Sequence, residues 1–375
     1  MQNKYLDSPS WISQTQAKAR GTIPTCDDDS FNLNNAKWLA FQNLLQKSIT
    51  PSTPWSTSPV STYNLIYTYY TTYAGGVLDM YGNIHMIPCW ANFGQMISTN
   101  GIVSTYSLLY SKLNAYYGGV LAPNGDIHFV PNSASVGQKI SASGVVSTYN
   151  LVYSGAFGLY YGGVLAPNGD IHFVPMSASV GQKISASGVV STYNLVYTTS
   201  YAYFGGCLAP NGDIHFVPYN ALVGQKISAN GVVSTYSIIS GGYIGGCLSP
   251  NGDIHMIPNN TLVGQKISTS GIVSTYNIRS TTLGSYQGGV LAPNGDIHMI
   301  PYSAAVGQKI SASGVVSTYS LVYTDSSGAY NGGVLGPNGD IHMIPNNAPI
   351  GQKISTNSCV TFEKSICSSP FFNKF

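Results

Sequence analysis

The chain has 375 residues and a formal net charge of only +2, and Asp, Glu, Lys and Arg together make up 7% of it. Ordinary soluble domains contain about 25% charged residues, so most of the surface must be neutral and hydroxyl-rich. The sequence has no cluster of Lys or Arg and no apolar run of 18 residues, which argues against nucleic-acid binding and against a membrane-spanning helix. The first residues also lack the apolar core of a secretory signal peptide.

Residues 1–58 precede a repeated region and are predicted to form an N-terminal extension with one short helix. Asn34 and Asn35 can cap a helix over 36–49, where apolar side chains recur on one face. The three adjacent Asp residues at 27–29 could contact a cation. A solvated turn is the simpler interpretation, because three neighbouring carboxylates cannot all point one way on a regular element.

From residue 59 to about 358 one sequence unit recurs seven times. Its clearest form is GGVLAPNGDIHFVP at 118–131, and close copies begin at Gly75, Gly162, Gly205, Gly245, Gly288 and Gly332. Each copy contains one His, and the chain has no others: His85, His128, His172, His215, His255, His298 and His342. A repeat of this length is typical of the blades of a β-propeller.

Each unit is predicted to contain four short strands. GGVLAP is the first, and the Pro-Asn-Gly turn leads into DIHFVP, the second. VGQKIS is the third, and a Ser/Asn-Gly turn leads into GVVSTYNLVY, the fourth. The fold class is therefore all-β, a seven-bladed β-propeller of four-stranded antiparallel blades over 59–358, preceded by the helical extension and followed by a C-terminal tail at 359–375.

The GGVLAPNGDIHFVP unit also resembles the blade motif of kelch-like or YncE-like propellers, which occur in repeat proteins of algae, marine phages and large viruses. The resemblance covers about 60–360. It implies a propeller and a virion or surface protein, and it brings no catalytic motif with it.

A segment of the fourth-strand type, VSTYNLIY at 60–67, occurs before the first GGVL segment. We expect it to close the ring by completing the last blade beside 350–355. The competing candidate is 360–364, a degenerate fourth strand that follows the last GQKIS segment.

Seven matched His residues could suggest a metal centre or a proton relay. They fall in the second strand of each unit and not in the strand that lines the axis, so successive imidazoles should lie too far apart to share one ion. We therefore predict structural His residues, no metal and no cofactor. Cys207 and Cys247 replace the Val of GGVL and are predicted to be small buried residues.

The Asp that precedes each strand of the DIHFVP type should face the Lys of GQKIS in the third strand, because side chains alternate along a strand. The first unit supports this hypothesis, since it has Asn83 in place of the Asp and Met96 in place of the Lys. A buried charge left alone would be costly, so the joint loss predicts ion pairs inside the other six units. The predicted pairs are Asp126–Lys139, Asp170–Lys183, Asp213–Lys226, Asp253–Lys266, Asp296–Lys309 and Asp340–Lys353.

The loops between the fourth strand of one unit and the first strand of the next vary widely and are rich in Tyr. In a propeller these loops emerge on one face and the two uniform turns on the other. The Tyr rings either cap the blade ends or are exposed and bind a glycan or another subunit. The candidate binding residues are Tyr73, Tyr117, Tyr160, Tyr161, Tyr203, Tyr243, Tyr286 and Tyr330.

No GxSxG, HExxH, GxGxxG or EF-hand pattern occurs in the chain. The predicted function is therefore that of a non-enzymatic structural or binding propeller that docks protein subunits of a larger assembly, or a surface receptor or glycan. A secreted glycan-binding propeller and a propeller enzyme, either a lyase or an oxidoreductase, are the alternatives. The expected location is a virion or an extracellular surface, and the cytoplasm stays open. We expect no nucleic-acid binding and no membrane insertion.

Overall fold

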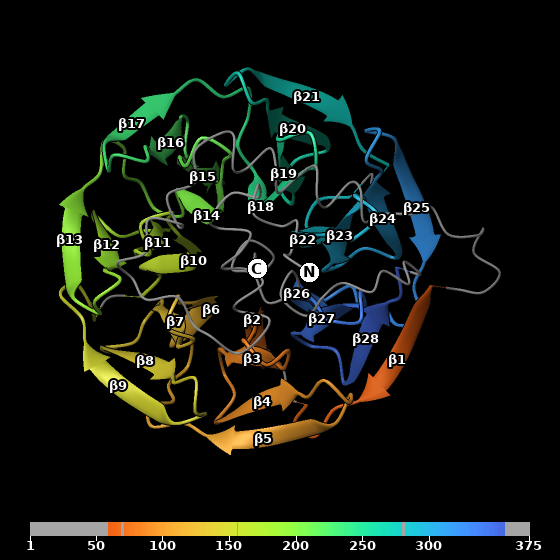
Figure 1. The fold of residues 1–375 in the computed structure, drawn as a ribbon. Helices are drawn as coiled ribbons and strands as arrows, with labels where there is room; N and C mark the ends of the chain where they lie inside the picture. The colour runs from red at the N-terminus through yellow and green to blue at the C-terminus, as the bar shows by residue number, and fades with distance from the viewer. Residues whose placement is uncertain (1–58, 69–70, 156, 280–281, 357–375) are drawn as a thin grey trace, which may run out of the picture.

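The computed structural model describes residues 59–68, 71–155, 157–279 and 282–356. In these residues 28 strands form seven four-stranded antiparallel sheets, which are arranged as blades around one axis (Figure 1). This arrangement confirms the predicted seven-bladed propeller. The helix expected at 36–49, the Asp run at 27–29 and the alternative closing strand at 360–364 lie outside the described residues. Within the described ranges no helix is long and apolar enough to cross a membrane.

The innermost strand of each blade begins at a Tyr and contains the GG dipeptide. These strands lie side by side around the axis, so the prediction that the GGVL segments surround the axis is confirmed. They are β2 (Tyr73–Leu78), β6 (Tyr116–Leu121), β10 (Tyr160–Leu165), β14 (Tyr203–Leu208), β18 (Tyr243–Leu248), β22 (Tyr286–Leu291) and β26 (Tyr330–Leu335).

The other three strands of each blade follow outward in chain order. The second strands are β3 (Ile84–Pro88), β7 (Ile127–Pro131), β11 (Ile171–Pro175), β15 (Ile214–Pro218), β19 (Ile254–Pro258), β23 (Ile297–Pro301) and β27 (Ile341–Pro345). The third strands are β4 (Phe93–Ile97), β8 (Val136–Ile140), β12 (Val180–Ile184), β16 (Gly224–Ile227), β20 (Val263–Ile267), β24 (Val306–Ile310) and β28 (Ile350–Ile354). The outer strands are β5 (Val103–Ser107), β9 (Val146–Asn150), β13 (Val190–Asn194), β17 (Val233–Tyr236), β21 (Val273–Asn277), β25 (Val316–Ser320) and β1 (Val60–Asn64).

Blades are numbered here in chain order, so blade 1 contains β2–β5 and blade 7 contains β26–β28 together with β1. Strand β1 pairs antiparallel with β28, with Val60 opposite Ile354 and Asn64 opposite Ile350. The predicted closure by the N-terminal strand is therefore confirmed. The last blade thus contains strands from both ends of the repeat array, which links the array into a ring.

The hydrophobic core lies between neighbouring blades, on the inner half of each sheet. The second strands are buried along their whole length, whereas the outer strands alternate between half-buried and exposed residues. At the axis the first Gly of each GG has a positive φ, such as +81° for Gly118. A Cβ at Gly118 would lie 3.2 Å from the Cα of Gly162 in the next blade. Only glycine allows seven strands to approach the axis this closely.

Neighbouring blades are also joined by a fully buried Gln in each third strand. In blade 2, Gln138 accepts hydrogen bonds through its Oε1 from the N–H groups of Leu109 (3.0 Å) and Tyr110 (2.8 Å), which follow the outer strand of blade 1. The same contact joins blade 7 to blade 1, where Gln95 accepts from Ile66 and Tyr67 after β1. The other equivalents are Gln182, Gln225, Gln265, Gln308 and Gln352.

Candidate functional site

The axis of the propeller is closed by one side chain from each blade, the residue immediately before the GG dipeptide. We call these seven residues the axial cluster: Ala74, Tyr117, Tyr161, Phe204, Ile244, Gln287 and Asn331. The cavity that remains among them and the glycine ring has a volume of about 20 Å³. One water molecule needs at least about 10–15 Å³, so this cavity among the described residues is too small for a substrate.

Three members of the axial cluster form a buried polar triad across the axis. Gln287 donates through Nε2 to the hydroxyl of Tyr161 (2.6 Å) and to Oδ1 of Asn331 (2.8 Å). The Tyr161 hydroxyl donates to the same Asn331 oxygen at 3.0 Å. Burial raises the pKa of Tyr161, so its hydroxyl keeps its proton at ordinary pH. These three hydrogen bonds link blade 3 to blades 6 and 7.

Beside the triad, aromatic rings form a continuous arc on the face of the variable loops. The Tyr161 ring lies 5.1 Å from Tyr117 and 4.7 Å from Phe204, and Phe204 lies 4.6 Å from Tyr219. Tyr201, in the loop before β14, stacks on Phe204 at 6.1 Å and is 42% exposed. We call these five residues the aromatic arc. Large aromatic side chains that are partly exposed and held by neighbours are typical of binding hot spots.

Tyr201 has an unusual backbone, because its φ is +56°. At the equivalent position, two residues before the first strand, Gly158, Gly284 and Gly328 also have positive φ, as do Thr71 and Asn114. A residue with a Cβ in this conformation costs roughly 1–2 kcal/mol. The backbone conformation therefore favours glycine at this position, and the presence of Tyr201 destabilises the fold.

Of the two alternatives for the candidate binding Tyr residues, burial as caps applies to most of them. Tyr73, Tyr160, Tyr203, Tyr243, Tyr286 and Tyr330 are 0% exposed, and Tyr161 is 9% exposed. Only Tyr117 is half-buried. The fully buried Tyr residues act as caps inside their blades, as the Tyr160 hydroxyl does when it donates to the carbonyl of Val180 at 3.0 Å. Tyr201 is exposed and Tyr219 is half-buried, and the sequence interpretation singled out neither of them.

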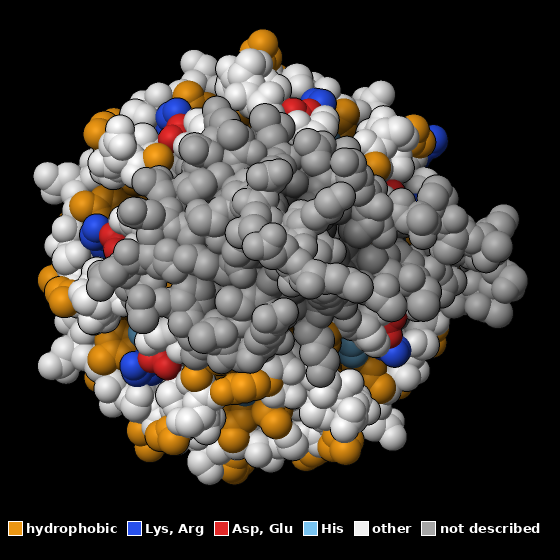
Figure 2. Space-filling model, in the orientation of Figure 1, with side chains coloured by type: hydrophobic (Ala, Val, Ile, Leu, Met, Phe, Trp, Pro, Cys, Tyr) orange, Lys and Arg blue, Asp and Glu red, His pale blue; other side chains and the backbone are white. Residues whose placement is uncertain are grey.

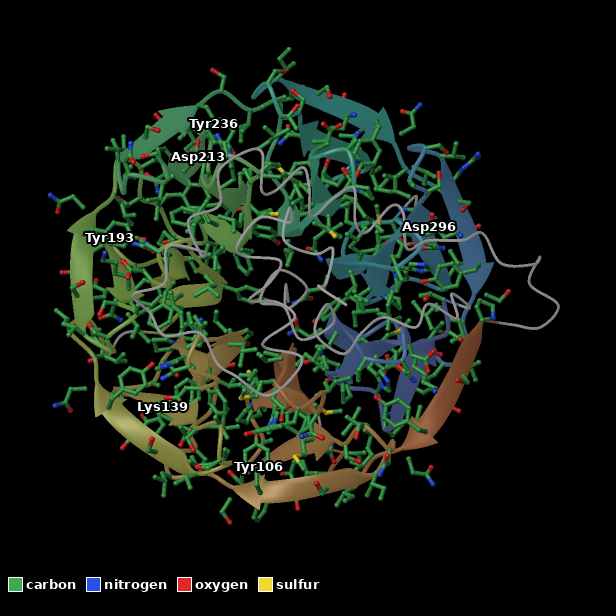
Figure 3. The ribbon with its side chains drawn as sticks, in the orientation of Figure 1. Tyr106, Lys139, Tyr193, Asp213, Tyr236 and Asp296 are labelled. Carbon is green, nitrogen blue, oxygen red and sulfur yellow. The ribbon has the colours of Figure 1, made fainter. Side chains whose placement is uncertain are left out.

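The predicted ion pairs are present in blades 2 to 7. Each Lys Nζ lies 2.6 or 2.7 Å from Oδ2 of the Asp in its own blade. The register that we predicted from alternation is also observed, since Ile127 is opposite Ile140 and His128 is opposite Lys139. Figure 2 shows the pairs as adjoining blue and red patches around the turn face, and Figure 3 shows Lys139, Asp213 and Asp296 in three separate blades.

Blade 1 lacks the pair but contains a carboxylate that the sequence interpretation missed. Asp79 stands where the other blades have Ala, Ser or Gly. It accepts hydrogen bonds from the N–H groups of Tyr81 and Asn83, both at 2.8 Å, and lies 3.3 Å from Nε2 of His85. Burial alone would raise the pKa of Asp79, but the hydrogen bonds from His85 and Asn83 outweigh it and lower the pKa. Blade 1 has therefore kept a carboxylate in its turn while losing the Lys.

Each His packs against the Tyr of its own outer strand, with ring centroids 5.3–5.6 Å apart in all seven blades. In blade 2 the Tyr149 ring covers Gly137, where any Cβ would overlap it, and its hydroxyl lies 3.3 Å from Nδ1 of His128. Burial, together with the nearby Lys139, lowers the pKa of His128 to about 4. The imidazole is thus neutral at ordinary pH.

The predicted small residues Cys207 and Cys247 are buried, at 0% and 3% exposure. Among the described residues no group of three or more His, Cys, Asp or Glu side chains could hold a metal ion.

No protein-family model matches the chain, and no curated protein matches its sequence. Solved structures do match. A streptogramin B lyase is similar with a TM-score of 0.70 and 20% identity over 80% of this chain and 99% of that one. A protein described as a gluconolactonase has a TM-score of 0.50 and 12% identity over 81% and 93%. The extracellular domain of a hybrid two-component system from B. thetaiotaomicron has a TM-score of 0.62 and 8% identity over 80% and 42%.

The likeness to these structures supports the fold, a seven-bladed β-propeller. The similar structures include enzymes and an extracellular domain of a two-component system, and at such identities the likeness concerns the fold alone.

Proposed function

We propose that the protein is a non-enzymatic binding propeller whose variable-loop face docks a protein subunit or a surface receptor. Tyr201 carries this proposal, because an exposed aromatic ring is retained in a backbone conformation that favours glycine. Strained residues persist where the surrounding structure holds them and where they have a use. The aromatic arc behind Tyr201 supplies a large and rigid contact area at a small entropic cost.

Two further features support a binding role over an enzymatic one. The axial cavity of about 20 Å³ is too small for a substrate at the place where blades converge. The charged groups of the turn face recur blade by blade and do not converge on one site. The likeness of the GGVLAPNG-type blade to repeat proteins of algae, marine phages and large viruses leads us to propose a virion or surface location.

The docking proposal is tested by placing a photoreactive phenylalanine analogue at position 201 of the full chain in its source. The expected result is one discrete cross-linked protein, which mass spectrometry identifies among the components of the same particle or surface. The matched control carries the analogue at Thr148, an exposed residue of the outer strand β9, and should not give that adduct. Absence of an adduct at 201, or turnover of a small substrate by the purified protein, would overturn the proposal.

Tyr201→Gly supplies a second test, because the two roles of this residue predict opposite effects. Relief of the backbone strain should stabilise the fold by about 1 kcal/mol, while loss of the ring should weaken docking. Thr71→Gly is the matched control, since Thr71 has a φ of +55° at the same position in blade 1 and lies outside the aromatic arc. It should stabilise the fold and leave docking unchanged. Equal docking by both variants contradicts the role of Tyr201.

A glycan ligand is the second candidate function, because partly exposed aromatic rings also stack on sugars. A glycan-array screen of the wild-type protein and of Tyr201→Gly distinguishes glycan binding from protein docking. Binding to the array that requires Tyr201, without any cross-linked protein, would favour the glycan.

A further inference from the structure

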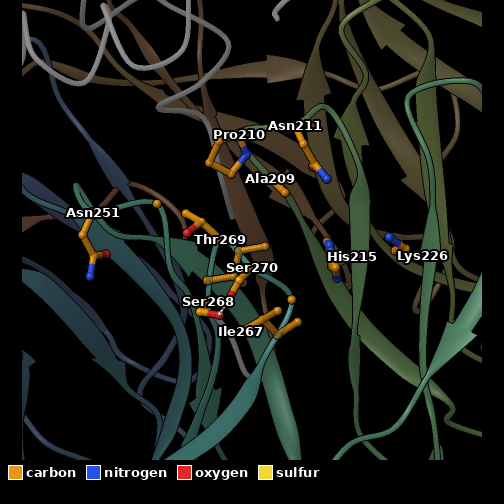
Figure 4. Close-up of a pocket in the computed structure, with 13 residues that line it drawn as sticks. Ala209, Pro210, Asn211, His215, Lys226, Asn251, Ile267, Ser268, Thr269 and Ser270 are labelled. Carbon is orange, nitrogen blue, oxygen red and sulfur yellow. Dashed lines mark hydrogen bonds between the residues drawn. The ribbon is translucent and has the colours of Figure 1, made fainter. Parts of the chain in front are cut away.

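A separate pocket lies on the opposite face, between blade 4 and blade 5. Its volume is about 430 Å³, which falls in the range of roughly 300–1,000 Å³ that holds small ligands. Figure 4 shows His215 and Lys226 on strands of blade 4, and Ser268, Thr269 and Ser270 on a turn of blade 5. The pocket is therefore formed by two blades and opens among the uniform turns, away from the aromatic arc.

Lys226 is the one charged residue among those that line this pocket. Lys226 contributes an ammonium group, and Asp213 lies 2.6 Å from it and balances it. Burial lowers the pKa of His215 to about 4, so this ring is neutral at ordinary pH. An ammonium group has three N–H donors, and the bond to Asp213 uses one. An anionic ligand would have to compete with the Asp213 carboxylate for Lys226.

The remaining lining offers groups that both donate and accept hydrogen bonds, above an apolar floor. Asn211 and Asn251 contribute amides, and the turn of blade 5 contributes three hydroxyl groups in succession. Ala209, Pro210, Ile254 and Ile267 supply the apolar part. Hydroxyl and amide groups match a ligand whose own hydroxyls donate and accept, while aliphatic side chains match C–H surfaces.

The turns of blade 5 differ from those of most other blades at two positions. Thr269 stands where four blades have Ala, at 142, 186, 229 and 312, whereas blades 1 and 7 also have Thr, at 99 and 356. Ser249 replaces Ala in the other turn and donates to the Asp253 carbonyl at 2.8 Å. Thr269 therefore adds a hydroxyl group to the lining of this pocket, whereas the Ser249 hydroxyl is used inside the turn and Ser249 does not line the pocket.

We propose that the pocket between blades 4 and 5 binds a neutral polyhydroxylated ligand, namely a mono- or disaccharide. Lys226 donates to a ligand hydroxyl, and the Thr269 hydroxyl and the Asn211 and Asn251 amides bind its neighbours. Pro210 and Ile267 contact the C–H face of the ring. The site is independent of the docking surface, which lies on the other face of the propeller.

Saturation-transfer NMR on the full chain with a panel of neutral methyl glycosides and disaccharides tests the proposal. At least one sugar should receive saturation, with a dissociation constant in the millimolar range, and glucuronate should not bind better than its neutral parent. Thr269→Ala recreates the Ser-Ala-Ser-Gly turn of blades 2, 3 and 6 and should weaken binding about fivefold, as expected for one hydrogen bond.

The double variant Asp213→Asn/Lys226→Met copies the residues of blade 1 and should weaken binding at least tenfold. Asp126→Asn/Lys139→Met makes the same change in blade 2 and should leave the affinity unchanged. The proposal is overturned if no neutral sugar binds, if only glucuronate binds, or if Thr269→Ala and the blade 4 variant both bind as wild type does. Tyr201→Gly should not alter sugar binding. Failure of the sugar-binding proposal is therefore distinguishable from failure of the docking proposal.

Discussion

Mild acid should unfold this propeller, because blades 2 to 7 each bury a neutral His. Burial lowers the pKa of these six residues to about 4, whereas the unfolded chain has the ordinary value near 6.5. Between these two values the unfolded state binds more protons than the folded state. Stability is therefore complete above about pH 6.5 and falls as the pH drops towards 4.

The size of the effect follows from the same two values. The difference corresponds to roughly 3 kcal/mol for each His at 1.36 kcal/mol per pH unit, and six residues together approach about 20 kcal/mol. A folded domain is usually stable by about 5–15 kcal/mol. The propeller should thus unfold cooperatively near pH 5, where the free energy of unfolding changes by up to roughly 8 kcal/mol per pH unit.

Urea unfolding followed by circular dichroism at several pH values between 7 and 5 measures this slope. His298→Gln should reduce the proton uptake by one, since His298 is 0% exposed and cannot be charged in place. The Asp213–Lys226 pair does not contribute between pH 7 and 5, because the interaction with Lys226 lowers the pKa of Asp213 despite its burial, and this stability is lost only as the pH falls below the ordinary Asp value near 3.8. A free energy of unfolding that stays constant from pH 7 to 5, or folded His resonances that titrate near 6.5, would refute the reasoning.

Three further changes test single features of the blade. Lys139→Met should cost about 1–3 kcal/mol in urea unfolding because it leaves the buried Asp126 carboxylate alone, whereas Asp126→Asn/Lys139→Met should be nearly neutral. Gln138→Leu should cost about 2–4 kcal/mol, because two backbone N–H groups of the preceding blade lose their acceptor, and equal stability to wild type would contradict this contact. Gly118→Ala should lower the melting temperature more than Gly144→Ala, since both have positive φ but only Gly118 faces the neighbouring backbone.

The fold could be predicted from the sequence because the seven copies of the repeat can be compared with one another. Seven copies with constant turns define the strands, and the additional fourth-strand sequence at Val60 defines how the ring closes. The ion pairs were predictable for a similar reason, since blade 1 loses Asp and Lys together. Strict alternation along the second and third strands then placed Lys139 opposite His128.

The burial of the Tyr residues was not predictable, because alternation fails in the innermost strands. In each of them the register shifts between the first Tyr and the second Gly, as between Tyr116 and Gly119. Such a bulge reverses the face on which the preceding residues lie. The sequence therefore cannot decide which of two adjacent Tyr residues points into the blade. The buried Gln occurs in all seven copies of the repeat. Its partners are backbone N–H groups of another blade, and a pattern of side chains cannot predict such a contact.

The axial cluster explains why sequence differences between the blades are not by themselves evidence of function. Seven identical large side chains cannot meet at one axis, so a repeat chain must break its symmetry there to fill the space. Tyr161, Gln287 and Asn331 do this by joining separate blades through three mutual hydrogen bonds. Tyr201 is different, because its backbone conformation favours glycine and its ring, which stacks on Phe204, is 42% exposed. The docking proposal therefore rests on the strained and exposed residue at the end of the arc, and the triad is assigned to the fold.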